Sequence, residues 1–158
     1  MKPLCLIFLF YLSPQWVFAQ SISIRADEWY PMNGDPEVDK PGYMIEFAKA
    51  IFESEGYVID YQLMPWKKAL ANANGGFIDC IVGAVKEEAP GLIYPNYHWG
   101  IDRSGIYVLE DDDWEFDGNY ESLSSRKIAV ILGYYYGNGL DEFLHANVGQ
   151  AVQFVDGK

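Results

Sequence analysis

The stretch "MPWKKALANANGGFIDCIVGAV" (Met64–Val85) carries the start of a helix, its end and a following strand. Pro65 suits the first turn of a helix, where a missing backbone N–H has no consequence. Gly75 and Gly76 predict the end of that helix, because glycine readily adopts the left-handed conformation that follows a last turn. The apolar run Ile78–Val82 then predicts a short strand covered on both faces, as strands of parallel sheets are.

A strand–helix–strand segment precedes this stretch. Ser21–Ala26 alternates apolar and polar residues, which predicts a strand, and residues 27–41 have the Asp, Pro, Gly and Asn content of a loop. Tyr43–Glu55 has the apolar spacing of an amphipathic helix that Gly56 ends, and Tyr57–Leu63 has strand composition. Strands that alternate with helices of this length favour an α/β fold, with a parallel sheet and helices on both of its faces.

An acidic segment at residues 111–122 marks a boundary in the chain. We therefore expect lobe 1 at residues 20–110 and the start of a second, incomplete lobe at residues 123–158. The elements expected beyond the third strand are a loop at Lys86–Pro95, an extended segment at His98–Leu109, a turn or short helix around Leu123, a strand at Lys127–Leu132, a Gly/Tyr-rich loop at Gly133–Gly139, a helix at Leu140–Ala146 and a strand at Ala151–Val155.

The composition of the 158 residues indicates a globular protein with an acidic surface. Half of the residues are hydrophobic and 16% are aromatic, which is enough to build a core. The formal net charge is −12. Because this charge repels phosphate backbones and anionic lipid, we expect neither nucleic acid nor a membrane surface as the main partner.

The first residues have the pattern of a secretory signal peptide. Lys2 precedes an unbroken apolar run, Leu4–Leu12, and the small residue Ala19 lies just before a possible cleavage at Gln20. An interfacial anchor or a buried helix is the alternative reading of residues 1–19. Removal of this segment leaves Cys80 as the only cysteine, a structural thiol in an apolar run. We expect a periplasmic protein that, once the signal is removed, does not insert into the membrane.

Candidate binding residues follow from the strand order. In open α/β sheets, ligands bind outside the carboxyl ends of parallel strands. Glycine lets a backbone approach a ligand closely, and aromatic rings offer flat faces. Each aromatic side chain has core packing as its alternative role, Trp66 above all because it lies on the apolar stripe of its helix. The expected ligand-binding residues are Asp27, Trp29, Tyr30, Trp66, Gly83, Ala84, Val85, Lys86, Glu88, Gly133, Tyr134 and Tyr135.

The order of these features resembles a known family. "ADEWYP" after the first strand, "PGYMIEFAKAIFESEGY" as the first helix, "MPWKKALANANGGFIDCIVGA" and "SLSSRKIAVILGYYYG" are similar to the family 3 extracellular solute-binding proteins, the periplasmic partners of ABC importers. The resemblance covers most of residues 21–145. It implies a type II periplasmic-binding fold, with a small polar or amino-acid-like solute held between two lobes. It also implies an ABC permease as a partner, and we expect a monomer.

Two features depart from the family pattern. Members that bind amino acids usually carry an arginine after the third strand, which clamps the ligand carboxylate. This chain has Lys86, Glu87 and Glu88 there, so a standard α-amino acid is not the expected ligand, and Glu88 favours a cationic or hydroxyl-rich one. Arg103 is an alternative carboxylate partner. The sequence also stops at Lys158 with only the opening of the second lobe, and we expect closure of the two lobes on a ligand to be impaired.

Other classes of function find less support in the sequence. An enzyme on this fold, similar to a dehydratase, would need separated acid and base groups, and no phosphate loop or nucleophile elbow is found. We expect no catalysis and no cofactor. The residues from Asp113 to Ser124 lack the glutamate that closes a calcium loop, and His98 and His145 lack ligand spacing, so no metal is expected. A ligand-sensing module of a receptor remains an alternative.

Overall fold

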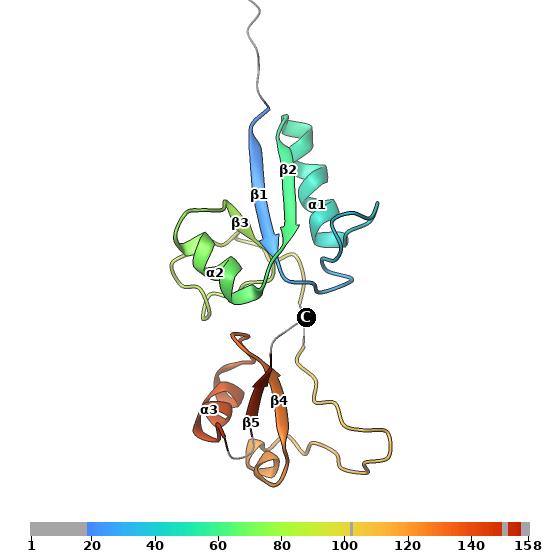
Figure 1. The fold of residues 1–158 in the computed structure, drawn as a ribbon, viewed down its shortest axis with the longest axis vertical. Coiled ribbons are helices and arrows are strands. Elements are labelled where there is room, and N and C mark those ends of the chain that lie inside the picture. The colour runs from blue at the N-terminus through green and yellow to red at the C-terminus, as the bar shows by residue number, and fades with distance from the viewer. Residues whose placement is uncertain (1–18, 102, 150–151, 156–158) are drawn as a thin grey trace, which may run out of the picture.

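The computed structural model describes residues 19–101, 103–149 and 152–155, which form a mixed α/β structure with two parallel sheets (Figure 1). The predicted signal peptide lies almost wholly outside the described residues and stays a prediction. The elements are β1 Ser21–Ala26, α1 Tyr43–Phe52, the 3-10 helix η1 Glu53–Glu55, β2 Val58–Leu63, α2 Trp66–Asn74, β3 Cys80–Ile81, the 3-10 helix η2 Tyr120–Ser125, β4 Ile128–Ile131, α3 Asn138–Ala146 and β5 Val152–Val155.

Lobe 1 contains a three-stranded parallel sheet in the order β2-β1-β3. Ser21 of β1 pairs with Val58 of β2, and Arg25 pairs with Ile81 of β3. The crossover from β1 to β2 and the crossover from β2 to β3 run in opposite directions across the sheet. Right-handed connections then place α1 and α2 on opposite faces, which agrees with the α/β arrangement expected from the sequence.

The helices of lobe 1 begin and end where the sequence predicts. Pro65 directly precedes α2, and Gly75 follows its last residue. The predicted first helix is α1 continued by η1, and Gly56 stops it with a left-handed φ of 85°. The apolar stripe of α1 packs on the sheet: Ile45 and Ala48 are fully buried against β1 and β2.

Lobe 2 is built in the same way on a smaller scale. β4 and β5 pair in parallel, with Ile128 opposite Val152. Buried side chains from η2, β4, α3 and β5 form a separate core, which consists of Leu123, Val130, Phe143, Leu144 and Val152. The predicted short helix, strand and second helix of this region are all present.

The carboxyl ends of the two sheets face each other. The arrowheads of β1 and β2 point toward lobe 2, and those of β4 and β5 point toward lobe 1 (Figure 1). A hydrogen bond from Tyr134 to Asp27, across 107 residues of sequence, joins the loop after β4 to the loop after β1. The loops that the sequence analysis selected therefore lie on the facing sides of the two lobes.

One predicted strand is shorter in the structure. The third strand was predicted at Ile78–Val82 but comprises Cys80 and Ile81 alone. It starts late because the carboxylate of Asp79 accepts hydrogen bonds from the backbone N–H (2.8 Å) and the hydroxyl (2.6 Å) of Ser23, where a longer strand would pair through its backbone. Within the described part of His98–Leu109 the chain forms neither helix nor strand.

The loop after β1 is fixed by a buried asparagine. Asn33 is 1% exposed, and its amide donates to the backbone carbonyl of Asp27 and to the hydroxyl of Tyr61 (3.3 Å). The Tyr61 hydroxyl in turn donates to the carbonyl of Gly34 at 2.8 Å. Backbone bonds between Trp29 and Asn33 close the loop into a tight turn. The sheet residue Tyr61 thereby fixes the conformation of the segment that carries Asp27 and Trp29.

Among the helices that the structure describes, none is long and apolar enough to cross a membrane.

We predict that Tyr61→Phe destabilises lobe 1 by about 1–2 kcal/mol, because a buried carbonyl and an amide each lose a partner. The measurement is the free energy of unfolding by urea. Tyr107→Phe removes the same hydroxyl from a side chain that is 94% exposed, and it serves as the control. Equal free energies for the two variants would show that the Tyr61 hydroxyl does not hold the loop.

The Asp79–Ser23 contact predicts a pH dependence of stability. Hydrogen bonds from Ser23 lower the pKa of Asp79 from its usual 3.8. A lowered folded pKa stabilises the protein above the unfolded value, and the stabilisation is lost as the pH falls through the folded pKa. We expect Asp79→Ala to reduce the free energy of unfolding by about 1 kcal/mol near pH 7, since the group is exposed, and by less near pH 3. The exposed Asp39→Ala variant should show neither effect.

Candidate functional site

The site is built from loops that leave one edge of each sheet. Ala26 at the end of β1 is level with Leu63 at the end of β2, and Ile81 of β3 pairs one residue earlier, with Arg25. In lobe 2, Ile131 and Val155 end together. Parallel pairing therefore brings the residues after each strand to a common edge, as expected for ligand sites in open α/β sheets.

Asp27 and Tyr134 form a hydrogen-bonded contact between the two lobes. The hydroxyl of Tyr134 donates to Oδ2 of Asp27, and both side chains are half-buried. Burial, together with the neighbouring Asp27 carboxylate, raises the pKa of Tyr134 well above its usual value. Tyr134 consequently remains a neutral hydrogen-bond donor at physiological pH.

The loop after β4 is held in place by Tyr136 and Asp141. The backbone N–H of Ile131 donates to the hydroxyl of Tyr136 at 2.8 Å. The backbone N–H of Tyr136 donates to the carboxylate of Asp141, in the first turn of α3, at 2.9 Å. The rings of Tyr134 and Tyr136 lie 6.2 Å apart between centroids. These bonds fix the loop so that Tyr134 reaches toward lobe 1.

Two glycines allow close approach at the facing loops. Gly83 has a φ of 97°, and a Cβ at that position would lie 3.5 Å from Cζ3 of Trp29. The indole of Trp29 therefore lies beside the backbone after β3. Gly133 has a φ of 89°, and a Cβ there would lie 3.6 Å from Cβ of Lys67, a residue of α2 in the other lobe. Both positions favour glycine because their φ values are unfavourable for other residues.

Trp66 and Glu88 connect α2 to the turn after β3. The indole N–H of Trp66, which is 8% exposed, donates to Oε1 of Glu88 at 2.6 Å. Burial raises the pKa of Glu88, the charges of Asp27 and Asp141 add to the effect, and the Trp66 hydrogen bond opposes it. The carboxylate thus lies in a negative environment. Trp66 is packed, which is the alternative role considered for it, and its role in ligand binding stays a prediction.

The structure brings together some of the predicted site residues and separates others. Asp27, Trp29, Gly83, Gly133 and Tyr134 lie along the facing loops, and Trp66 and Glu88 lie next to them.

The other predicted residues differ in their exposure, and the predictions made for them stay predictions. Tyr30 is 70% exposed and its ring lies against Gly34, so its loop turns it away from the partners expected for it. Val85 contributes its backbone carbonyl to the following turn while its side chain is exposed, and Lys86 is exposed. Ala84 and Tyr135 are half-buried, and Arg103, the alternative carboxylate partner, is exposed.

Sequence reasoning missed the residues that hold the loops in place. Asn33 lies inside a segment predicted only as a loop, and Asp141 lies inside a predicted helix. An acidic residue in the first turn of a helix was a possible signal for Asp141. No periodicity distinguishes the buried Asn33 from the polar residues around it.

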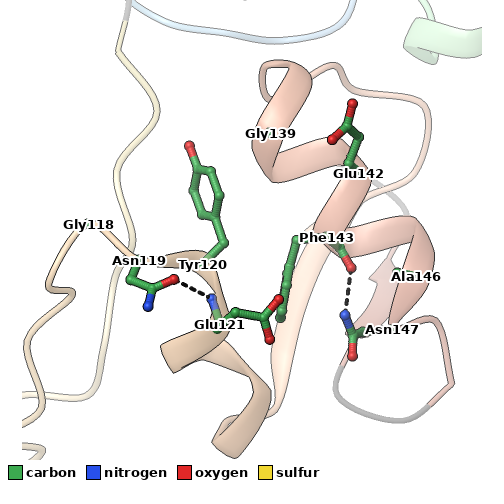
Figure 2. Close-up of a pocket in the computed structure, with 9 residues that line it drawn as sticks. All are labelled: Gly118, Asn119, Tyr120, Glu121, Gly139, Glu142, Phe143, Ala146 and Asn147. Carbon is green, nitrogen blue, oxygen red and sulfur yellow. Dashed lines mark hydrogen bonds between the residues drawn. The ribbon is translucent and has the colours of Figure 1, made fainter.

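A separate hollow of about 420 Å³ lies in lobe 2 (Figure 2). It is lined by η2 and the outer side of α3, including Tyr120, Glu121, Glu142 and Phe143. Its amides are used locally: Asn119 accepts from the N–H of Glu121, and Asn147 donates to the carbonyl of Phe143. The hollow shares no lining residue with the strand-end site. The polar groups that remain in it, two glutamates, do not distinguish it from an ordinary surface groove.

Chemically, the strand-end site offers carboxylate acceptors and aromatic faces. Within the described ranges, no three His, Cys, Asp or Glu side chains are grouped so that they could hold a metal ion. Burial raises the pKa of the Cys80 thiol, which makes it a poor nucleophile.

Comparisons with protein-family models, with curated proteins and with solved structures found no significant match to this chain.

We predict that Trp66→Phe raises the pKa of Glu88 further, because the indole N–H stabilises the ionised carboxylate. Titration of the glutamate side-chain carboxyl signals by NMR measures the change. The signal of the exposed neighbour Glu87, compared between the two proteins, is the internal control. A pKa of Glu88 that stays constant or falls in the variant would contradict a hydrogen bond from Trp66.

Proposed function

We propose that this protein binds a small polar solute between its two lobes and delivers it to an ABC importer, with the type II periplasmic-binding arrangement that the sequence resembles. The observation that supports this most directly is the Tyr134–Asp27 hydrogen bond, since it links the carboxyl edges of two parallel sheets. Ligands of open α/β proteins bind at such edges. Delivery to a permease and location in the periplasm rest on the resemblance and on the pattern of residues 1–19.

The side chains at this edge support binding rather than catalysis. Trp29 and Tyr134 offer ring faces, while Asp27 and Glu88 offer acceptors. The Glu88 carboxyl has the raised pKa of a possible general acid, but its Oε1 is already bound to the indole of Trp66. An acid–base pair would need a second group with an opposite shift. A ligand-sensing module of a receptor would use the same site for the same binding step.

We predict that a small polar solute raises the melting temperature of the full chain, because a ligand that binds the folded state alone stabilises it. Thermal unfolding against amino acids, polyamines and small sugars measures the effect. Trp29→Ala should abolish the ligand-dependent shift, whereas Trp99→Ala should retain it, since Trp99 packs against Phe47 of α1 at 5.1 Å between ring centroids. A chain that responds to none of these compounds would refute solute binding.

A further inference from the structure

We propose that the solute is an organic cation with a primary or secondary ammonium group, that the Asp27 carboxylate accepts its N–H, and that the ligand displaces the hydroxyl of Tyr134 from that carboxylate. The inference rests on the proposed function and specifies the chemistry of its ligand. It is carried by the Asp27–Tyr134 contact, by the ion pairs of the described residues, neither of which includes a site carboxylate, and by the aromatic rings beside these carboxylates.

The first step is that Asp27 already binds a donor from the opposite lobe. Its backbone carbonyl is held by Asn33, so the carboxylate projects from a fixed turn. Its Oδ2 accepts the hydroxyl of Tyr134, which belongs to a loop fixed by Tyr136. In this form the tyrosine O–H occupies the position that a donor group of a ligand would take. An ionised carboxylate or a fully ionised phosphate of a ligand could not replace it, because neither has a hydrogen to donate.

The second step concerns charge. The two ion pairs among the described residues are Arg25–Asp60 and Arg126–Asp112, and neither includes a site carboxylate. Asp27, Glu88 and Asp141 are half-buried, and the charges of Asp27 and Asp141 both act on Glu88 to raise its pKa. Half-buried carboxylates without a paired cation favour a positively charged ligand over a neutral one and disfavour an anion.

The third step concerns the rings. Trp29 is half-buried and lies beside the backbone of Gly83, and the ring centroids of Tyr134 and Tyr136 lie 6.2 Å apart. An ammonium group attached to an aliphatic chain is attracted to aromatic faces, and its methylene groups pack on them. Carboxylate and ring together select an amine more strongly than either does alone.

The experiment compares matched small molecules by isothermal titration calorimetry with the full chain. The probes are putrescine and agmatine as cations, 1,4-butanediol as the uncharged analogue of putrescine with the same chain length, and succinate as the dianion. We expect binding of a diamine, at least about 10-fold weaker binding of the diol and no binding of succinate, since one charge-assisted hydrogen bond corresponds to about that ratio.

Three substitutions assign the roles of the residues. Asp27→Asn should weaken amine binding about 10-fold or more, while the exposed neighbour Glu28→Gln leaves it unchanged. Glu88→Gln should weaken it less than Asp27→Asn does, with Glu87→Gln as the matched control. Tyr134→Phe keeps the ring and removes the competing donor, so amine affinity should rise about 2- to 10-fold.

The outcomes separate this inference from the function on which it rests. Binding of sugars or of anions with no response to amines would overturn the cation assignment and leave solute binding intact. A chain that binds no compound of any class would overturn both. Equal or weaker amine binding by Tyr134→Phe would overturn the displacement of Tyr134. If Asp27→Asn does not fold by circular dichroism, the comparison of Glu88→Gln with Glu87→Gln, together with the diamine–diol ratio, still decides the cation assignment.

Discussion

The parallel pairing of the strands determines where the loops that follow them can lie. Two parallel strands cannot be joined by a tight turn, so each pair requires a crossover, and every strand of a sheet then ends at the same edge. In lobe 1 this brings the residues after Ala26, Leu63 and Ile81 together although they are far apart in sequence. In lobe 2 the same constraint presents the loop after Ile131. The Tyr134–Asp27 bond is possible because both edges face the same space.

The residues along these edges are arranged for purposes other than stability. Repulsion between half-buried carboxylates lowers stability, and a sequence selected for folding alone would place a cation or an apolar side chain beside them. The stabilising polar contacts are elsewhere: Arg25 binds Asp60 on the sheet, and Arg126 binds Asp112 ahead of η2. The hydrogen bond between Asn33 and Tyr61 fixes the loop after β1 to the sheet. Both ion pairs among the described residues thus lie away from the edge, and neither uses Asp27 or Glu88.

The sequence predicted the elements well where local chemistry decides them. Pro65, Gly56 and Gly76 mark helix ends that the structure confirms, because each acts through its own backbone preference. The third strand was predicted too long, because the shortening depends on a long-range contact from Asp79 to Ser23. The rule that ligands bind outside the carboxyl ends of parallel strands selected Asp27, Trp29 and Tyr134. It could not predict that Tyr30 turns toward Gly34, because that orientation depends on the turn that Asn33 closes. Contacts that cross the two lobes leave no periodic pattern in the sequence.

The Tyr134–Asp27 bond also limits how tightly a ligand can bind. Any solute that binds the Asp27 carboxylate must first break a hydrogen bond within the protein. The solute can bind there only in molecules in which this bond is open, so the observed affinity is the intrinsic affinity multiplied by the fraction of such molecules. A ligand that merely equals the tyrosine hydroxyl as a donor would gain nothing at this position. A charged ammonium group forms a stronger bond with a carboxylate than a neutral hydroxyl does, so it gains free energy by the exchange. The tyrosine therefore favours cations over hydroxyl compounds even before a contact elsewhere in the site contributes.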